Sequence, residues 1–208
     1  MTALSGRRGQ AARNDVAFLA AARECFTLDP GAPVSAVAQA AGVGISALYR
    51  RYPSKEALLA RLCLDGLGEF IDIARRASAE ADAGKAFAVF VRGIVEADVH
   101  ALTVSLAGLF HPTDEHRARA ADSGRLAHEL LTAAQAAGVV RRDVVDEDLP
   151  MLWEQLTAIH GADAARTAQL RRRYVEIQLA GLRPVTADPL PEGAPTTAEL
   201  GARWVPRV

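Results

Sequence analysis

Residues 41–59 read AGVGISALYRRYPSKEALL, and this stretch decides the fold. Gly42 lies where one helix must end and the chain must reverse, because glycine adopts the left-handed backbone conformation without steric cost. Pro53 ends a second, short helix. Ser54 can cap a third helix, since its hydroxyl can accept a hydrogen bond from the free amides of a first helical turn. A helix, a turn, a helix and a new helix start, in this order, predict a helix-turn-helix module.

The apolar residues around this turn support the same interpretation. They recur at the three- and four-residue spacing of a one-sided helix, at Val34, Val37, Ala38 and Ala41 before the turn and at Leu48 and Tyr52 after it. The two short helices are therefore expected to pack across one core.

The second short helix is expected to present its outer face to DNA. If it starts near Ile45, a rotation of about 100° per residue points Ser46, Ala47 and Arg50 outward. Ser46 can hydrogen-bond to a base edge or a phosphate, and Ala47 can pack on a thymine methyl group. The guanidinium groups of Arg50 and Arg51 can engage guanine or grip phosphate, and the sequence does not separate these roles. Ile45 lies near the inward side, so a core position and a DNA contact both stay open for it.

From about residue 14 to residue 62 the chain resembles the DNA-binding domain of the TetR family of bacterial transcriptional regulators. The shared features are the turn at residues 40–43, the Leu48-Tyr49 pair, the aromatic Tyr52 and the helix start at residues 53–59. The chain departs from the family pattern at residues 32–34 and at Gly44, where Ser or Thr is usual. Proline and glycine still permit helix starts at these places.

The resemblance implies two further DNA contacts. It implies that the Tyr49 hydroxyl donates to a backbone phosphate and that Lys55 pairs with another, supported by helix-start amides. The predicted DNA-binding residues are therefore Ile45, Ser46, Ala47, Tyr49, Arg50, Arg51 and Lys55.

The formal net charge of −1 hides an asymmetry. Residues 1–62 carry eight Arg or Lys against four Asp or Glu, whereas the remainder carries sixteen against twenty-one. Only the N-terminal part suits a polyanion such as double-stranded DNA. Residues 1–13 are predicted to be a flexible basic arm containing Arg7, Arg8 and Arg13. This arm can either enter the minor groove or serve as an unstructured solubilising segment.

Composition narrows the class of protein. Half of the 208 residues are apolar, which is enough for a real core. The sequence shows neither an apolar run as long as a membrane span nor the apolar core of a secretory signal, so we expect a cytoplasmic protein with no membrane partner. Cys25 and Cys63 lie in apolar helical stripes and are interpreted as packing thiols, not as a disulfide or a metal pair. We expect no metal and no cofactor.

We predict an all-α chain, with an N-terminal three-helix bundle that contains the helix-turn-helix and a larger helical ligand-binding and dimerisation domain after it. The predicted parts are the basic arm (1–13), the DNA-binding domain (14–62), the regulatory domain (63–183) and a flexible Pro-rich tail (184–208). Asn14 is expected to cap the first helix. Helices are further predicted from Ser54 to about Ala79, over residues 87–110 with a break near His100, and over about 114–137, 147–160 and 162–182.

The resemblance implies that the regulatory domain binds a small-molecule effector and forms a homodimer through its last two long helices. A dimer is also expected because one short helix reads too few base pairs, and paired readers must lie about 34 Å, or a small multiple of it, apart. The candidate dimer residues are Leu170, Tyr174, Ile177 and Leu182, which can form one apolar stripe. The candidate pocket residues are Phe87, Phe90, His100, Phe110, His111, Met151, Trp153 and His160.

The expected function is a repressor that binds a palindromic operator as a dimer and is released by a small molecule. An architectural DNA-binding protein without an effector is one alternative. A small helical enzyme is another, but Asp98 and His100 are too close in sequence to share a helix face. No nucleophile motif, phosphate loop or metal spacing accompanies them, so we expect no enzymatic activity.

Overall fold

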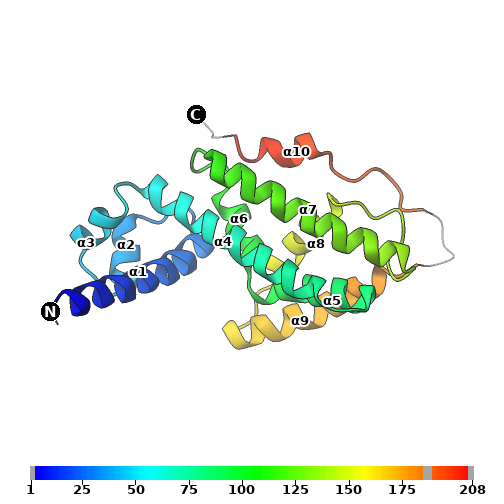
Figure 1. The fold of residues 1–208 in the computed structure, drawn as a ribbon, viewed down its shortest axis with the longest axis horizontal. Helices are drawn as coiled ribbons and strands as arrows, with labels where there is room; N and C mark the ends of the chain where they lie inside the picture. Colours follow the sequence, from blue (N-terminus) through cyan, green and yellow to red (C-terminus); the bar gives the residue numbers. More distant parts are fainter. Residues whose placement is uncertain (1–2, 185–188, 206–208) are drawn as a thin grey trace.

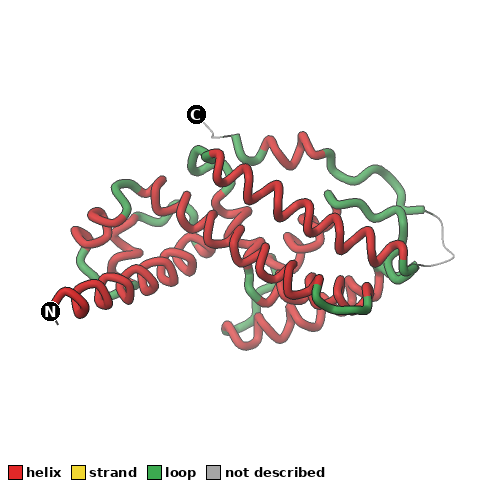
Figure 2. Tube along the Cα trace, in the orientation of Figure 1, coloured by secondary structure: helices red, strands yellow, loops and turns green. Residues whose placement is uncertain are grey.

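The computed structural model describes the backbone of residues 3–184 and 189–205, and this part of the chain forms helices joined by loops (Figures 1 and 2). The helices are α1 (Ala3–Leu28), α2 (Val34–Ala40), α3 (Ile45–Arg51), α4 (Lys55–Ser78), α5 (Ala83–Glu96), α6 (Val99–Leu106), α7 (Asp114–Ala136), α8 (Asp148–Thr157), α9 (Ala164–Gly181) and α10 (Thr197–Ala202). The prediction of an all-α fold is confirmed. No helix within the described residues is both long and apolar enough to cross a membrane.

Helices α1, α2 and α3 form a small bundle at one end of the molecule (Figure 1). Its core contains Phe18 and Phe26 from α1, Val37 from α2 and Leu48 from α3, each at most 2% exposed. Tyr52, directly after α3, is also buried. Leu48 and Tyr52 therefore point inward as the helical spacing predicts.

The turn between α2 and α3 has the predicted geometry. Gly42 has a φ of +68°, in the left-handed region that glycine tolerates. Its amide donates to the carbonyl of Gln39, and the amide of Val43 donates to the carbonyl of Ala38, both at 3.0 Å. These bonds satisfy carbonyls at the end of α2 and turn the chain into α3.

Helix α4 belongs to two hydrophobic cores. The Ser54 hydroxyl accepts from the amide of Ala57 at 3.1 Å, which confirms the predicted cap. The first turns of α4 contribute Leu58, Leu59, Leu62 and Cys63 to the N-terminal core. Its last turns contribute Ile71, Ile73, Ala74 and Ala77 to the core shared by α5, α7, α8 and α9.

The two cores are not separated at residue 62. Leu102 and Leu106 of α6, and Phe110 after it, pack in the N-terminal core. Arg23 of α1 also reaches across: it pairs with Glu69 of α4 at 2.8 Å and donates to the carbonyl of Ala97 at 2.8 Å. Helix α6 therefore supports the N-terminal bundle although it lies far along the chain.

The predicted helix boundaries in the C-terminal half are largely confirmed. The break expected near His100 falls at Ala97 and Asp98, where Asp98 has a φ of +51°. Helix α7 ends before Gly138, which has a φ of +70°. Helices α8 and α9 are each a few residues shorter than predicted.

Two predictions about the ends of the chain are wrong. Helix α1 begins at Ala3, not at Asn14, so most of the predicted flexible arm 1–13 is helical in its backbone. Residues 184–208 were predicted to be a flexible tail, but they contain α10, whose Thr197 hydroxyl donates to Glu147 just before α8. Thr196 and Glu199 form a reciprocal capping box that starts this short helix. Residues 1–2, 185–188 and 206–208 of these segments lie outside the described part.

Candidate functional site

The outer face of α3 carries most of the predicted DNA-binding residues. Ile45 is 41% exposed and Tyr49 is 46% exposed, and Ser46 and Arg50 are exposed as well. Ala47 is half-buried against the N-terminal core. The question left open for Ile45 is therefore settled in favour of the surface. Ile45, Ser46, Tyr49 and Arg50 therefore form an accessible face of the kind that fits a major groove.

Arg51 has an intramolecular partner. Its Nε and Nη2 atoms donate to the two carboxylate oxygens of Asp15 in α1, each at 3.1 Å. The Tyr52 hydroxyl donates to the same carboxylate at 2.7 Å. The Arg51 hydrogen bonds, helped by Tyr52, hold the pKa of Asp15 below its ordinary value, and burial together with Asp15 raises the pKa of Tyr52 to about 12. Arg51 thus ties the end of α3 to α1, while 58% of its side chain remains exposed.

Lys55 also has intramolecular partners. Its Nζ donates to the carbonyls of Pro30 and Ala32, both at 2.9 Å, and lies 5.1 Å from the centre of the Phe26 ring. The start of α4 is therefore clamped to the loop between α1 and α2. An ammonium group has three donors, and these bonds use two of them.

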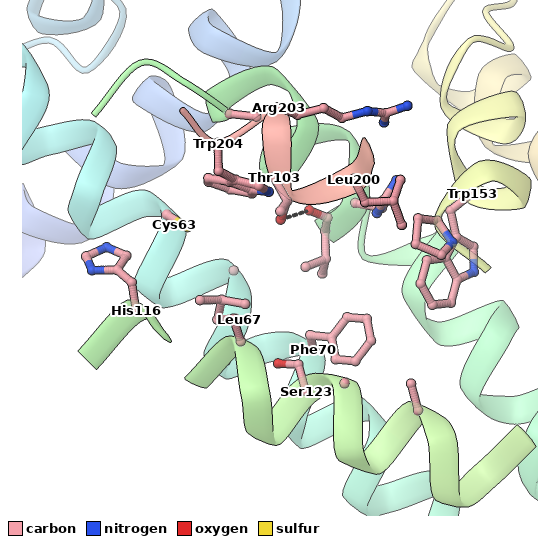
Figure 3. A pocket seen from close by; sticks show the side chains of 18 of the residues that line it. Cys63, Leu67, Phe70, Thr103, His116, Ser123, Trp153, Leu200, Arg203 and Trp204 are labelled. Carbon is pink, nitrogen blue, oxygen red and sulfur yellow. Dashed lines mark hydrogen bonds between the residues drawn. The ribbon is translucent and has the colours of Figure 1, made fainter. Parts of the chain in front are cut away.

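A cavity of about 430 Å³ lies behind α4, between α6, α7, α8 and α10. Figure 3 shows Leu67 and Phe70 of α4 on one side and Trp153 of α8 on another, with Leu200 and Trp204 of the C-terminal segment above them. The cavity volume lies in the range of small-molecule sites, and its lining is mostly apolar. The structure therefore provides a chamber that shares α4 with the DNA-binding bundle.

Two histidines stand among the apolar groups of the cavity lining. His116 is 4% exposed; its Nε2 lies 2.9 Å from the carbonyl oxygen of Ala60 in α4, and its Nδ1 lies 2.7 Å from the hydroxyl of Thr113. Because a carbonyl only accepts, Nε2 must carry the proton. Burial lowers the pKa of His100 to about 4, against the opposing effect of Glu154, so this ring is neutral at pH 7.

The structure brings three of the predicted pocket residues to the cavity and leaves the others outside it. His100, Phe110 and Trp153 line the cavity. Phe87 and Phe90 do not line it: both are fully buried in the C-terminal core, where the Phe90 ring packs behind Phe70 and Trp153.

Three further pocket candidates lie outside the cavity. His111 is on the surface, where its Nδ1 lies 2.8 Å from a carboxylate oxygen of Glu56. Met151 lies on α8 outside the lining and contacts Arg203 through its sulfur at 3.9 Å. His160 is exposed in the loop before α9. Their positions on loops or on the outer side of α8 are the reason, because a residue lines a chamber only if its helix face turns inward.

Several lining residues were not predicted. The most prominent are Cys63, Leu67 and Phe70 of α4, His116 and Ser123 of α7, and Leu200 and Trp204 near the C-terminus. An apolar stripe along α4 is visible in the sequence, but only the fold shows which part of it faces a space. Burial raises the pKa of the Cys63 thiol to about 12, so it stays protonated at neutral pH. Cys25 and Cys63 are both free.

The candidate dimer residues on α9 divide between surface and core. Tyr174 is 44% exposed and Ile177 is 54% exposed, whereas Leu170 is half-buried. Leu182 is 8% exposed and belongs to the C-terminal core, so its assignment to the dimer face is wrong. It lies just past the end of α9, and its carbonyl accepts from the amide of Arg141 in the loop after α7.

Within the described residues, no group of His, Cys, Asp and Glu is arranged to hold a metal ion. The fold and the two sites define a helix-turn-helix protein in which helix α4 connects the N-terminal bundle of α1, α2 and α3 to an internal cavity. Residues 18–62 match the family profile described as bacterial regulatory proteins of the tetR family. Residues 82–184 match the profile described as the C-terminal domain of SbtR-like transcriptional regulators.

Solved structures agree with these matches. The TetR transcription regulatory protein from Mycobacterium vanbaalenii is 30% identical, with 85% of this chain and 99% of that chain covered and a TM-score of 0.57. The chain belongs to the TetR family of bacterial transcriptional regulators. The regulator SCO0520 from Streptomyces coelicolor is 28% identical, with 84% and 99% covered and a TM-score of 0.53.

More distant structures share the fold alone. The ketosteroid transcriptional regulator KstR2 of Mycobacterium tuberculosis is 17% identical, with 86% of this chain and 96% of that chain covered and a TM-score of 0.59. No functionally curated protein matches the sequence significantly.

Proposed function

We propose that the protein is a cytoplasmic repressor that binds a palindromic operator as a homodimer and leaves it when a small molecule enters the cavity. The observation that carries this proposal is the position of α4. One end of α4 packs in the core that holds α3, and further along the same helix Leu67 and Phe70 line the cavity. A molecule in the cavity can therefore act on the helix that holds the reading head.

The operator half of the proposal is tested by selecting bound duplexes from random DNA at near-physiological salt. The expected result is a two-fold symmetric site whose half-sites are one or more helical turns apart. A single asymmetric site, or no preference for any sequence, would contradict it.

Arg50 and Arg51 form a matched pair for testing the reading face. Arg50 is exposed on α3, whereas Arg51 holds Asp15. Replacing Arg50 by Ala should lower operator affinity by about tenfold or more without changing the thermal midpoint. Replacing Arg51 by Ala should lower both the affinity and the stability. Equal operator affinity of Arg50→Ala and the wild-type protein would remove Arg50 from the interface.

Two N–H groups of the Lys55 ammonium bond to carbonyls, and we propose that the third N–H group pairs with a DNA phosphate. Replacing it by Ala should weaken binding to all duplexes alike and reduce the slope of log K against log salt by about 1. Because the change also releases the loop between α1 and α2, binding must be compared at a temperature where the variant is fully folded. A loss of affinity for one sequence only would contradict the phosphate role.

The effector half of the proposal depends on differential binding. A hundredfold loss of operator affinity requires an effector that binds the released form about 2.7 kcal/mol more tightly than the DNA-bound form. A thermal-shift screen of small apolar molecules, followed by operator-release measurements on the hits, tests this. Stabilisation by one chemical class together with operator release supports a repressor with an effector. A flat response across the screen would favour the architectural alternative.

A further inference from the structure

The C-terminal segment closes one side of the cavity. Leu200, Arg203 and Trp204 line it (Figure 3). The Trp204 ring stands edge-on to the ring of Phe110, with ring centres 6.1 Å apart. This segment lies beyond residue 184, where the match to the family profile ends. The fold of the matched regulatory domain therefore does not account for it.

The segment is fastened by an ion pair at the edge of the cavity. Arg203 pairs through Nη1 with a carboxylate oxygen of Glu154 in α8, and the Glu154 side chain is 28% exposed. A second bond joins the Thr197 hydroxyl, as donor, to Glu147 at 2.7 Å. The cation that pairs with Glu154 at the cavity therefore belongs to the C-terminal segment.

No other strong cation balances Glu154 among the described residues. His100 Nε2 lies 3.8 Å from the same carboxylate, but its ring is neutral at pH 7. This Nε2 is buried and has no hydrogen-bond partner in the described part of the chain. Only 28% of the Glu154 side chain is exposed, so a cation that replaces Arg203 offsets the cost of leaving this carboxylate unpaired.

The remaining charged groups of the lining also favour a positively charged ligand. Asp146 accepts from His128 through one oxygen, and its other oxygen is buried without a partner among the described residues. The Arg117 guanidinium is already engaged by Asp114 and by the carbonyl of Pro112. Two carboxylates therefore face a mostly apolar chamber, and the cation that pairs with one of them comes from the C-terminal segment.

We propose that the effector is an apolar molecule with one protonated amine, and that this amine replaces Arg203 at Glu154 while the C-terminal segment moves aside. In the tautomer that carries its proton on Nδ1, the Nε2 atom of His100 can accept a second N–H from the same amine. Arg203 and Trp204 then act as built-in competitors of the effector. This inference rests on the proposed function, because it names the chemistry of the effector that the function requires.

Three probes with one ring system and different charges test the selectivity of the cavity. The probes are naphthylethylamine, naphthylethanol and the anion of naphthaleneacetic acid. Their binding to the full-length protein is measured by titration calorimetry at pH 7. The amine should bind about tenfold more tightly than the alcohol, and the carboxylate should bind most weakly.

Substitutions separate the roles of Glu154 and Arg203. Glu154→Gln should lose the preference for the amine over the alcohol. Arg203→Gln should bind the amine about tenfold more tightly than the wild-type protein, because the competitor is gone. Arg172→Gln, on the exposed side of α9, serves as the control and should change neither affinity. Circular dichroism and the thermal midpoint show whether each variant is folded.

The outcomes distinguish this inference from the function on which it rests. Equal binding of the three probes, or an unchanged amine preference in folded Glu154→Gln, overturns the charge selectivity and leaves the effector cavity standing. Binding by none of the three overturns both. Tight amine binding with no change in Arg203→Gln overturns the competition by the C-terminal segment.

Discussion

Single residues determine the backbone conformation of the helix-turn-helix, and Gly42 in the turn between α2 and α3 is the clearest case. A Cβ at this position would meet nothing within 4 Å, so the requirement for glycine comes from its φ of +68° and not from space. Gly42→Ala should therefore lower the free energy of unfolding by about 1 kcal/mol, measured by urea denaturation.

Gly138 provides the matched control, because it has a φ of +70° and equally open surroundings at the end of α7. Gly138→Ala should cost a similar free energy but leave operator affinity unchanged at temperatures where the protein is folded. Gly42→Ala should in addition reduce operator affinity, since it disturbs the turn before α3. An identical effect of both variants on DNA binding would contradict this difference.

His100 predicts a pH dependence of stability. Its folded pKa of about 4 lies below the ordinary value of 6.5, so the unfolded chain binds more protons between these values and stability falls as pH falls below about 6.5. At pH 5 the loss amounts to about 2 kcal/mol relative to pH 7.

Replacing His100 by Gln removes this contribution. Urea unfolding of the wild-type protein and His100→Gln at pH 7 and pH 5 measures it as a difference of differences, so other titrating groups cancel. The same loss between pH 7 and pH 5 in both proteins would show that His100 is not held neutral by its surroundings.

For single residues, the sequence predicted the direction in which a side chain points better than it predicted what the side chain contacts. Helical spacing placed Leu48 and Tyr52 inward and Arg50 outward, because one turn of helix has a fixed geometry. Phe87 and Phe90 were predicted to line the pocket because they are apolar residues of the regulatory domain, and the structure buries both in the C-terminal core. The sequence does not reveal that these two rings meet a filled core instead of a cavity, since that depends on helices distant in sequence.

Among the helices, α4 contributes residues to both hydrophobic cores, and the role of its N-terminal cap can be tested. Ser54→Ala removes the acceptor for the amide of Ala57 and should cost about 1 kcal/mol of stability. Ser78→Ala, at the other end of α4, is the control. It removes only a hydroxyl that donates to the carbonyl of Ala74, a carbonyl already inside a helix, and should cost much less. Equal losses of thermal midpoint would mean that the cap does not define the start of α4.

Helix boundaries were predictable where a local signal marks them. Gly42, Ser54 and Gly138 give such signals, and the structure confirms each one. The start of α1 was missed because residues 3–13 lack an apolar period, and nothing local distinguishes a helical extension from a flexible arm. Helix α10 was missed although Thr196 and Glu199 carry the capping pattern, because the surrounding prolines outweighed it.

For the whole molecule, the exposed apolar side chains of α9 predict the assembly. Tyr174 and Ile177 are both about half exposed and lie on one side of the helix. Replacing both by Asp should give a monomer at micromolar concentration by light scattering and a strong loss of operator affinity.

The control for this prediction is Val145→Asp, since Val145 is 41% exposed but lies in the loop before α8. It should leave both mass and affinity unchanged. A dimer that persists in the double variant would place the two-fold contact elsewhere on the molecule.

The membership of α4 in two cores has a consequence for how such a regulator can diversify. With 24 residues, α4 is about 36 Å long. A substitution at Phe70 that admits a new molecule also alters the support of the reading head, so a gain in one property tends to disturb the other. The buried residues of α8 belong to the C-terminal core alone, whereas His116 of α7 bonds to α4 and Trp204 packs against the N-terminal core. Laboratory redesign of the sensing range should therefore vary the α8 surface first and leave the shared helix untouched.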